Sequence, residues 1–382
     1  MKPNKYIELK DYLDDSLAKY FSEFISYKNN KARFNFVGLL AKDDKYFFIY
    51  PKYTKNTDVD TNHDDFLEIL SVIEKYHKIN LMANDIEDNE DLNPLNIAIL
   101  IIKDFYENGI YTNTKDSFGL NDDNEICWEK TIDELEAIIV NDTPIYLDFY
   151  THTQVEFDSF IKELHKAILD SIFTKYADIL KVLQISISNV DGVSLDSLGE
   201  VDYLIQRLEN ELKVQFITAK RYTLKLLINY LKSLKSNVLN ADYLGTKYFH
   251  NVWEDVCRTY LKGQKNSIIQ KPQWIIKGVK NEKDTLEPDV LVGDKTSLKI
   301  YDAKYYDLDE NTPSVNDIVK QIAYKKAYEL EKYNVVLNAF VTPSLNCESI
   351  ENVGEVQFLN ESITIFYLNP KVAYKNYLTI RK

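Results

Sequence analysis

The chain has 382 residues, of which 45% are hydrophobic and 13% aromatic, so it can bury a sizeable core in two or three domains and is not a disordered protein. Its three cysteines, Cys127, Cys257 and Cys347, are far apart and form no CxxC pair. This spacing argues against a disulfide framework and a zinc site and favours a reducing cytoplasm.

Membrane and secretory segments are not expected. The longest apolar run, residues 97–102, is far shorter than the roughly 20 residues of a membrane span. The first 27 residues are charged throughout and do not resemble a signal peptide. We therefore expect a cytoplasmic protein with no membrane partner.

The net charge of −14 is unevenly distributed, because the whole acidic excess precedes residue 236. One interpretation is that these charges simply solvate the surface. The other is that the acidic half faces a protein partner, while the neutral half approaches a polyanion once metal ions sit on its carboxylates.

The first 150 residues predict an α+β module, which we interpret as a partner-docking region (1–150). Two β-rich runs, 33–40 and 45–52, flank a polar turn at 41–44 and predict a hairpin. Apolar residues recur at helical spacing within 64–77, and residues 144–150 predict a short strand.

Residues 151–235 predict a helical connector. Three apolar stripes at helical spacing indicate packing surfaces: Phe157, Ile161, Leu164 and Ile168; Leu204, Ile205, Leu208 and Leu212; Leu224, Leu227, Leu231 and Leu234.

In residues 236–382 the pattern changes to helix, strands, helix and strand, which predicts a third domain. The apolar stripe predicts a helix over 243–261. Strands follow at 289–292, 298–306, 335–341 and 363–368, and a capping box at Ser314 and Asp317 opens a helix that runs to about residue 333.

Two carboxylates and a lysine converge on the first pair of these strands. Antiparallel pairing about a turn at residues 295–296 places Asp289 beside Asp302, and strand alternation puts Lys304 on the same face as Asp302. Carboxylates this close repel unless a divalent cation such as Mg²⁺ lies between them. Such an ion can promote hydrolysis of a phosphodiester, and Lys304 can orient the attacking water or stabilise the charge of the transition state. A cross-strand ion pair on a solvated face is the structural alternative.

These residues resemble a known nuclease signature. Pro288-Asp289 followed by Asp302-Ala303-Lys304 is similar to the PD-(D/E)xK superfamily. The flanking segments Phe249-His250-x-Val252-Trp253-Glu254-x-x-Cys257, Asp302-Ala303-Lys304-Tyr305-Tyr306 and Asp317-x-x-x-Gln321-x-x-x-Lys325 resemble McrC-like and LlaJI-type restriction endonuclease subunits. The resemblance is specific over about residues 243–330 and weaker at 126–132 and 144–148.

The resemblance implies a Mg²⁺-dependent DNA endonuclease subunit, with Mn²⁺ as a substitute. It also implies an α/β PD-(D/E)xK core, a mixed sheet flanked by helices, in residues 236–382, after the α+β module and the helical middle region. It implies that Asp289, Asp302 and Glu254 hold the metal, with Ala303 in the same site, and that Lys304 is the catalytic lysine. Gln321 would hold the DNA or the active site from the following helix.

The implied partners are duplex DNA and an McrB-like, GTP-driven AAA+ NTPase through which the chain joins an oligomer. The sequence contains no G-x-x-x-x-G-K-[ST] loop, so the partner would supply NTP hydrolysis. No basic recognition helix appears either, so site readout would be delegated.

Several alternatives stay open on the sequence alone. Glu254 can pair with Arg258 one helical turn away, and Gln321 and Tyr324 can be ordinary helix-surface residues. Tyr324 also follows Gln321 by three positions, where many relatives have four. At the level of the protein, the alternatives are a regulatory adaptor that stimulates the NTPase and a stand-alone repair or recombination nuclease.

Overall fold

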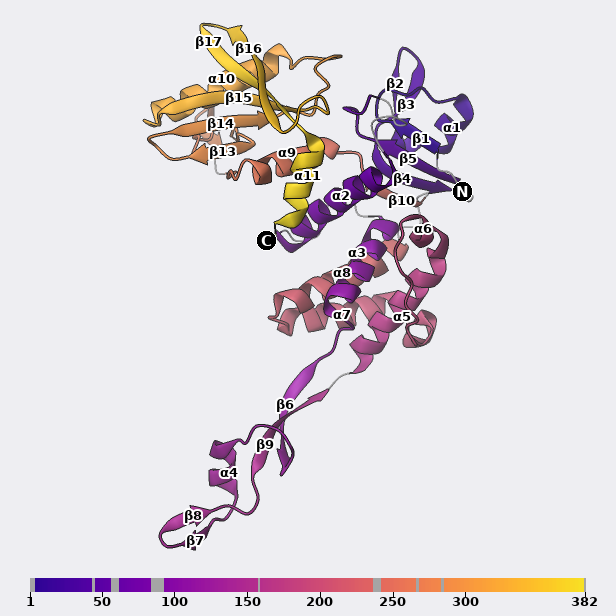
Figure 1. The fold of residues 1–382 in the computed structure, drawn as a ribbon, viewed down its shortest axis with the longest axis vertical. Coiled ribbons are helices and arrows are strands. Elements are labelled where there is room, and N and C mark those ends of the chain that lie inside the picture. The colour runs from indigo at the N-terminus through magenta and orange to yellow at the C-terminus, as the bar shows by residue number, and fades with distance from the viewer. Residues whose placement is uncertain are drawn as a thin grey trace. The chain divides into compact units, whose positions relative to one another are not determined.

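A computed structural model describes residues 4–42, 45–55, 62–83, 93–156, 159–235, 242–265, 268–282 and 285–380. The protein is a mixed α/β chain that packs as two compact units (Figure 1). One unit joins Met1–Asn96 to Val238–Lys382, and the other is Ile97–Asn237. Among the described helices, none has the length and apolarity required to cross a membrane.

The N-terminal sheet of the first unit contains a strand from far along the chain. Its order is β1 (Asn4–Ile7), β5 (Lys45–Tyr50), β4 (Val37–Lys42) and β10 (Asp242–Thr246). The expected helix over 243–261 is therefore wrong at its start: β10 pairs antiparallel with β4, and α9 spans Phe249–Tyr260. The reason is Gly245, whose φ of 156° is not helical and which lies opposite Gly38 in the sheet.

The expected hairpin over 33–52 is confirmed in its pairing but not in its bounds. β4 and β5 pair antiparallel, while their connecting residues, 43–44, lie outside the described residues. Residues before β4 form a separate hairpin of β2 (Ile25–Lys28) and β3 (Lys31–Phe34), which follows α1 (Asp15–Tyr20) and a 3₁₀ turn (Ser22–Phe24).

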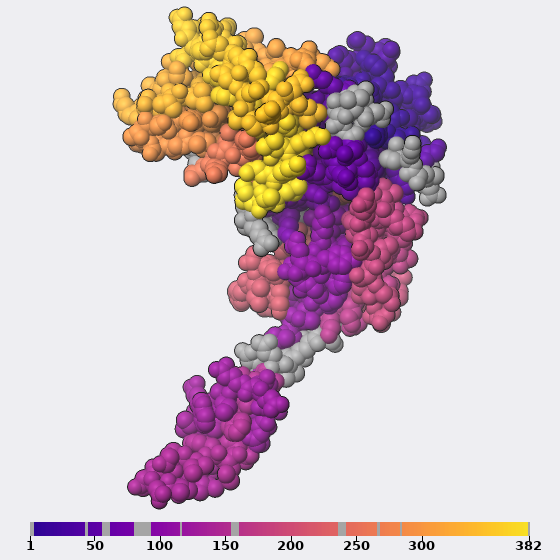
Figure 2. Space-filling view, viewed as in Figure 1, coloured from indigo at the N-terminus to yellow at the C-terminus, as the bar shows by residue number. Residues whose placement is uncertain are grey.

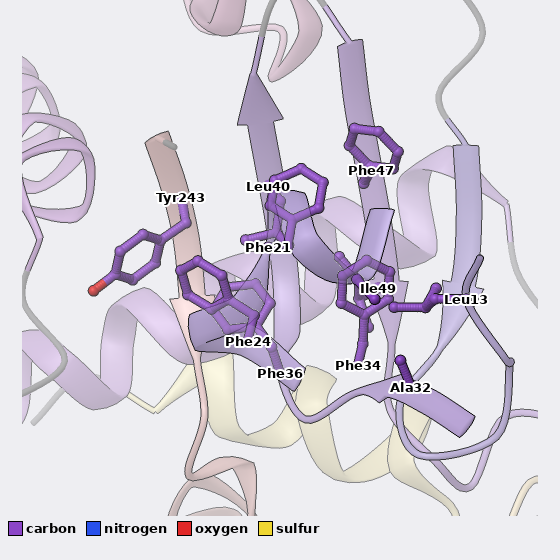
Figure 3. Packing of buried hydrophobic residues seen from close by; sticks show 11 residues of the cluster. Leu13, Phe21, Phe24, Ala32, Phe34, Phe36, Leu40, Phe47, Ile49 and Tyr243 are labelled. Atoms are coloured by element: carbon purple, nitrogen blue, oxygen red, sulfur yellow. The ribbon is translucent and has the colours of Figure 1, made fainter. Parts of the chain in front are cut away.

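An aromatic core holds this module together (Figure 3). Tyr243 of β10 packs edge-on against Phe24, with ring centroids 4.9 Å apart, and contacts Phe36 at 5.8 Å. The buried members of the cluster are Leu13, Ala18, Phe21, Phe24, Ala32, Phe34, Phe36, Leu40, Phe47, Ile49 and Tyr243. Because Tyr243 belongs to this core, the C-terminal segment is built into the N-terminal module.

Three helices join the two segments of this unit. The predicted helix over 64–77 is confirmed as α2 (His63–Ala83), and it packs against α9 and α11 (Pro370–Thr379). The Tyr53 and Tyr374 hydroxyls lie 2.7 Å apart, and the Tyr377 hydroxyl donates to Asp255 Oδ2 at 2.6 Å.

The second sheet of this unit is mixed, as expected. Its order is β13 (Val290–Gly293), β14 (Leu298–Ala303), β15 (Val335–Pro343), β17 (Glu361–Leu368) and β16 (Ile350–Phe358). β14, β15 and β17 are parallel, and the edge strands β13 and β16 are antiparallel to their neighbours. The predicted capping box at Ser314 opens α10 (Val315–Leu330), which packs on β14, β15 and β17. β16 and the hairpin of β11 (Gln273–Ile276) and β12 (Val279–Glu282) were not expected from the sequence.

The second unit, Ile97–Asn237, contains a helical part and a narrow ribbon (Figure 2). The helices are α3 (Pro94–Asn108, which begins before the unit), α5 (Ser159–Lys175), α6 (Ala177–Val182), α7 (Val201–Val214) and α8 (Thr218–Lys235), with a 3₁₀ turn at Leu195–Leu198. The predicted stripes on α5, α7 and α8 are largely buried, although Phe157 lies outside the described residues.

The ribbon is built from β6 (Thr114–Leu120) and β9 (Tyr150–Glu156) and carries α4 (Trp128–Glu134), β7 (Ile138–Val140) and β8 (Thr143–Ile145) between them. The strand expected over 144–150 is split between the end of β8 and the start of β9.

Candidate active site

The hairpin of β13 and β14 has the predicted register. Val290 lies opposite Tyr301 and Gly293 opposite Leu298, so the same register continues to Asp289 and Asp302. The Asp289 carboxylate turns toward the end of β14, where its Oδ2 accepts the Ala303 N–H at 2.8 Å. The two carboxylates therefore meet at the end of the hairpin, next to the parallel strand β15.

Burial and like charge act together on Asp289. Asp289 is 9% exposed and Asp302 is 1% exposed. Burial, followed by the charges of Asp302 and Glu254, raises the pKa of Asp289 to about 8. Within the described residues, Asp302 Oδ1 has no hydrogen-bond donor, and Lys304 Nζ lies 2.7 Å from Asp302 Oδ2. A divalent cation between these two buried carboxylates would relieve the repulsion between their charges.

Glu254 approaches this pair from α9. Burial raises the pKa of Glu254; the charge of Lys265 opposes this shift and the charge of Asp302 adds to it. The alternative pairing with Arg258 does not form among the described residues, because Arg258 binds Asp255 Oδ1 at 2.9 Å and the Asp289 carbonyl at 3.1 Å. Glu254 thus stays close to the other carboxylates, and the charges of Arg258 and Lys304 only partly oppose the rise of its pKa.

Lys304 is held between two carboxylates. Its Nζ lies 2.7 Å from Asp302 Oδ2, at angles outside hydrogen-bond geometry, and 2.8 Å from Asp317 Oδ1. Only 14% of the Lys304 side chain is exposed, so the alternative of a solvated ion pair is wrong. Burial lowers the pKa of Lys304, but the two acidic partners outweigh it and raise the pKa above its ordinary value.

Asp317 is a site residue whose role the sequence analysis missed. It was expected as the capping residue of α10 and as part of the segment that resembles the family, but without a contact to Lys304. It does complete the cap, because its Oδ2 accepts the Ser314 N–H at 2.9 Å. Its other oxygen binds Lys304. A signal was present in the sequence, because the capping box fixes this carboxylate at the first turn of a helix that packs on the strand bearing Lys304.

Gln321 and Tyr324 are buried, so the helix-surface alternative is wrong for both. Gln321 Nε2 donates to Asn338 Oδ1 at 2.8 Å and to the Ala339 carbonyl at 3.2 Å, which fastens α10 to β15. The Tyr324 hydroxyl donates to the Glu287 carbonyl at 2.7 Å and so fixes the segment that leads into Asp289. Through these hydrogen bonds, both residues hold α10 against the strand β15 and the segment before Asp289.

The donor set fits a magnesium ion held by few protein ligands. No group of three or more His, Cys, Asp or Glu side chains in the described part of the chain has the arrangement of a metal site. Mg²⁺ is nevertheless commonly bound through one or two carboxylates, with water and substrate oxygens completing its shell. Asp289 and Asp302 meet that requirement, and Glu254 and Ala303 stay predicted contributors.

Residues of the N-terminal module bind the segment that follows Lys304 through a hydrogen bond and an ion pair. The Tyr305 hydroxyl donates to the buried Glu8 carboxylate at 2.6 Å. Lys10 Nζ lies 2.6 Å from Asp307 Oδ2. The position of Lys304 therefore depends on contacts made by residues near the start of the chain.

The chain is similar to known restriction proteins over most of its length. The profile of the family "LlaJI restriction endonuclease" matches residues 36–371. A curated relative, the type II restriction enzyme BsuMI component YdjA of Bacillus subtilis (strain 168), is 29% identical over 402 residues, which cover 96% of this chain and 85% of the relative.

Two solved structures show weaker overall similarity. The McrC-bound McrB AAA+ hexamer assembly of Thermococcus gammatolerans gives a TM-score of 0.40 at 15% identity and covers 93% of this chain and 84% of that chain. The McrBC complex of the same organism gives 0.26 at 11% identity, with 68% and 88% covered. From the family match over most of its length, the chain belongs to the LlaJI restriction endonuclease family.

Proposed function

We propose that this chain is the Mg²⁺-dependent DNA-cutting subunit of a restriction system and that its second sheet is a PD-(D/E)xK nuclease core. The observation that carries the proposal is the buried group of Asp289, Asp302 and Lys304 at the end of one hairpin. A restriction endonuclease family needs a site that hydrolyses phosphodiesters, and this group has the residue types for it.

Each residue of the candidate site would have its own role in the hydrolysis of the phosphodiester. Asp289 and Asp302 would hold Mg²⁺, with Glu254 beside them, and the ion would activate a water and neutralise charge on the phosphate. In the metal-free protein the charges of Asp302 and Asp317 raise the pKa of Lys304, which favours its charged, hydrogen-bond-donating form. It would orient the attacking water or stabilise the transition-state charge while one P–O ester bond breaks.

We further propose that an AAA+ NTPase docks on the ribbon of the second unit. The ribbon exposes an unusual series of large apolar side chains for a chain with so many charged residues: Leu120 (52%), Trp128 (54%), Ile132 (58%), Ile139 (64%) and Leu147 (71%). Exposed apolar series of this kind mark protein interaction sites. The class of the partner comes from the resemblance to McrC-like subunits, in which GTP drives the motor.

The decisive experiment is cleavage of long duplex DNA with Mg²⁺ or Mn²⁺. Wild type, Asp302→Asn and the charge-matched surface control Asp196→Asn are each assayed with and without the AAA+ partner, in GTP, ATP or no nucleotide. Cleavage by wild type and Asp196→Asn that needs partner and nucleotide, and that Asp302→Asn abolishes, is the expected result.

Two other results would replace the proposal. Cleavage by the purified chain without any partner identifies a stand-alone nuclease. Full stimulation of the partner's NTPase by both wild type and Asp302→Asn, with no cleavage in any condition, identifies a regulatory adaptor in which the carboxylates are structural.

A further inference from the structure

A hairpin with an unusual surface connects α9 to the strand that carries Asp289. β11 and β12 pair across a two-residue turn at Lys277 and Gly278, whose φ angles of 52° and 80° are those of a type I′ turn. Every residue of both strands is exposed. A two-stranded ribbon of this length gains little stability from itself, so its surface is available for binding.

The segment around this hairpin is basic, although the protein as a whole is acidic. Between residues 258 and 281 there is no acidic residue, although the net charge of the chain is −14. The basic residues of the segment are Arg258, Lys262, Lys265, Lys271, Lys277 and Lys280. None of the salt bridges formed among the described residues uses Lys271, Lys277 or Lys280, and all three side chains are exposed.

One face of the hairpin is apolar as well. Ile276 lies opposite Val279, and Trp274 lies two positions before Ile276 on the same face. Their exposed fractions are 58%, 61% and 49%. Lys277 lies in the turn next to this face, and Lys280 lies on the opposite face of the narrow ribbon. An exposed aromatic and aliphatic face with lysines on the same ribbon fits the grooves of nucleic acid, where phosphates flank apolar sugar and base edges.

The base of the hairpin is tied to the candidate active site. Gln264 and Leu291 exchange two backbone hydrogen bonds of 2.9 Å, which adds the segment before the hairpin to the edge of β13. On the other side, Thr285 Oγ1 donates to the Gln270 carbonyl at 3.1 Å. The segment before the hairpin is therefore anchored at Leu291, two residues from Asp289, and Lys265 is close enough to influence Glu254.

We propose that the β11–β12 hairpin is a duplex DNA-binding element that holds the substrate beside Asp289 and Asp302. Lys271, Lys277 and Lys280 would contact phosphates, and the face of Trp274, Ile276 and Val279 would enter a groove, which a two-stranded ribbon can do. The proposal rests on the proposed nuclease function and adds the surface that captures the substrate. Charge complementarity selects an anionic occupant, and the pairing of Gln264 with Leu291, next to the candidate nuclease site, favours DNA over an acidic protein surface.

The test measures DNA binding separately from cleavage. Fluorescence anisotropy of a labelled duplex is followed over a salt series, in Ca²⁺ to prevent cutting, with the full chain. The variants are the triple substitution Lys271→Gln, Lys277→Gln, Lys280→Gln and the single substitution Trp274→Ala. The matched controls are Lys28→Gln, Lys45→Gln, Lys332→Gln in one chain and Phe216→Ala in another, all at exposed positions.

Each phosphate contact contributes about 0.9 to the slope of log K against log salt. The hairpin triple variant is therefore expected to lower that slope by roughly 2 to 3 and to weaken binding at least about tenfold near 0.1 M salt. Trp274→Ala is expected to weaken binding with no change in slope, because it removes no charge. The two controls should bind as wild type does.

Binding by the hairpin variants that equals the controls in both affinity and slope would overturn the inference. So would retained DNA binding with loss of co-elution with the AAA+ partner, which would make the hairpin a protein contact. Failure of the nuclease proposal looks different: the hairpin variants lose DNA binding, but wild type cuts no DNA under any condition.

Discussion

Asp289 links the ionisation of the site to the stability of the whole protein. Its pKa of about 8 in the folded protein lies well above the value near 4 of an aspartate in an unfolded chain. Between these two pH values the folded protein holds a proton that the unfolded chain has released. The free energy of unfolding of the metal-free protein must therefore fall as pH rises through this window.

Asp289→Asn removes this effect, since the amide carries no charge at any pH. In EDTA, we expect the Tm of the variant to exceed that of wild type by an amount that grows from about pH 5 to about pH 8 and then levels off. Scanning calorimetry at several pH values measures it. A difference that does not change with pH would show that Asp289 is ionised throughout.

At high pH, Mg²⁺ should reverse the order of the Tm values of wild type and Asp289→Asn that is expected without metal. Mg²⁺ binds the ionised carboxylates and stabilises only the folded state, so it should raise the Tm of wild type at about pH 8. Asp289→Asn should gain much less, and so should Asp302→Asn. An equal gain in all three proteins would mean that the ion binds elsewhere.

Asp317 is expected to act through Lys304, although it also caps a helix. Asp317→Asn removes the negative charge that Lys304 contacts, and loss of such a supporting partner typically lowers activity by about 10- to 100-fold. Ser314→Ala is the matched control, because it removes the cap hydrogen bond from the Asp317 N–H and the hydroxyl bond to Asp317 Oδ2, and leaves Asp317 Oδ1 in contact with Lys304. It should cost about 1 kcal/mol of stability with little loss of cleavage.

Cleavage rates and urea unfolding of the two variants separate the two roles. If Ser314→Ala loses as much activity as Asp317→Asn, the contribution of Asp317 is that of a helix cap alone.

At the scale of elements, the pairing of β10 with β4 depends on two facing glycines. A Cβ on Gly245 would lie 2.2 Å from the Val37 carbonyl oxygen and 2.5 Å from the Phe36 ring, at a φ of 156°. Gly354 has a similar φ of 146° but nothing within 4 Å of the same position. Gly354→Ala therefore reports backbone strain alone, whereas Gly245→Ala adds a clash with the core.

Gly354→Ala is expected to cost about 1 to 3 kcal/mol and Gly245→Ala clearly more, as measured by chemical unfolding. Equal losses would indicate that the strands separate freely at Gly245, which would contradict the close pairing of β10 with β4.

The elements also show which parts of the fold a sequence reveals. The register of β13 and β14 and the capping box at Ser314 were predicted correctly, because a short turn and a four-residue motif determine them locally. The pairing of β10 with β4 was missed, because it joins residues about two hundred positions apart and the nearby helix stripe concealed the strand. The proximity of Asp289 and Asp302 was predictable for the same local reason, whereas the contact of Lys304 with Asp317 depends on how α10 packs.

At the scale of the whole molecule, the second unit is an insertion into the first. The residue before the insertion lies close to β10, the first described strand after it, because the Asn96 side chain donates to the Gly245 carbonyl at 3.3 Å and accepts the Gly245 N–H at 3.2 Å. The surrounding unit is completed by contacts across the gap in sequence, such as Tyr305 with Glu8 and Tyr53 with Tyr374. A short Gly/Ser linker from residue 96 to residue 242 should therefore preserve this unit.

We expect such a shortened chain to unfold in one cooperative transition and to keep the pH-dependent Tm difference caused by Asp289→Asn. Residues 238–382 alone should not fold stably, because β10 would lose β4 and Tyr243 would lose its aromatic neighbours. Calorimetry and amide exchange at β10 measure both outcomes. The shortened chain should also fail to co-elute with the AAA+ partner, since it lacks the apolar ribbon. Retained co-elution would place the docking surface on the first unit. The coupling of NTP hydrolysis to the site at Lys304 would then also pass through the first unit.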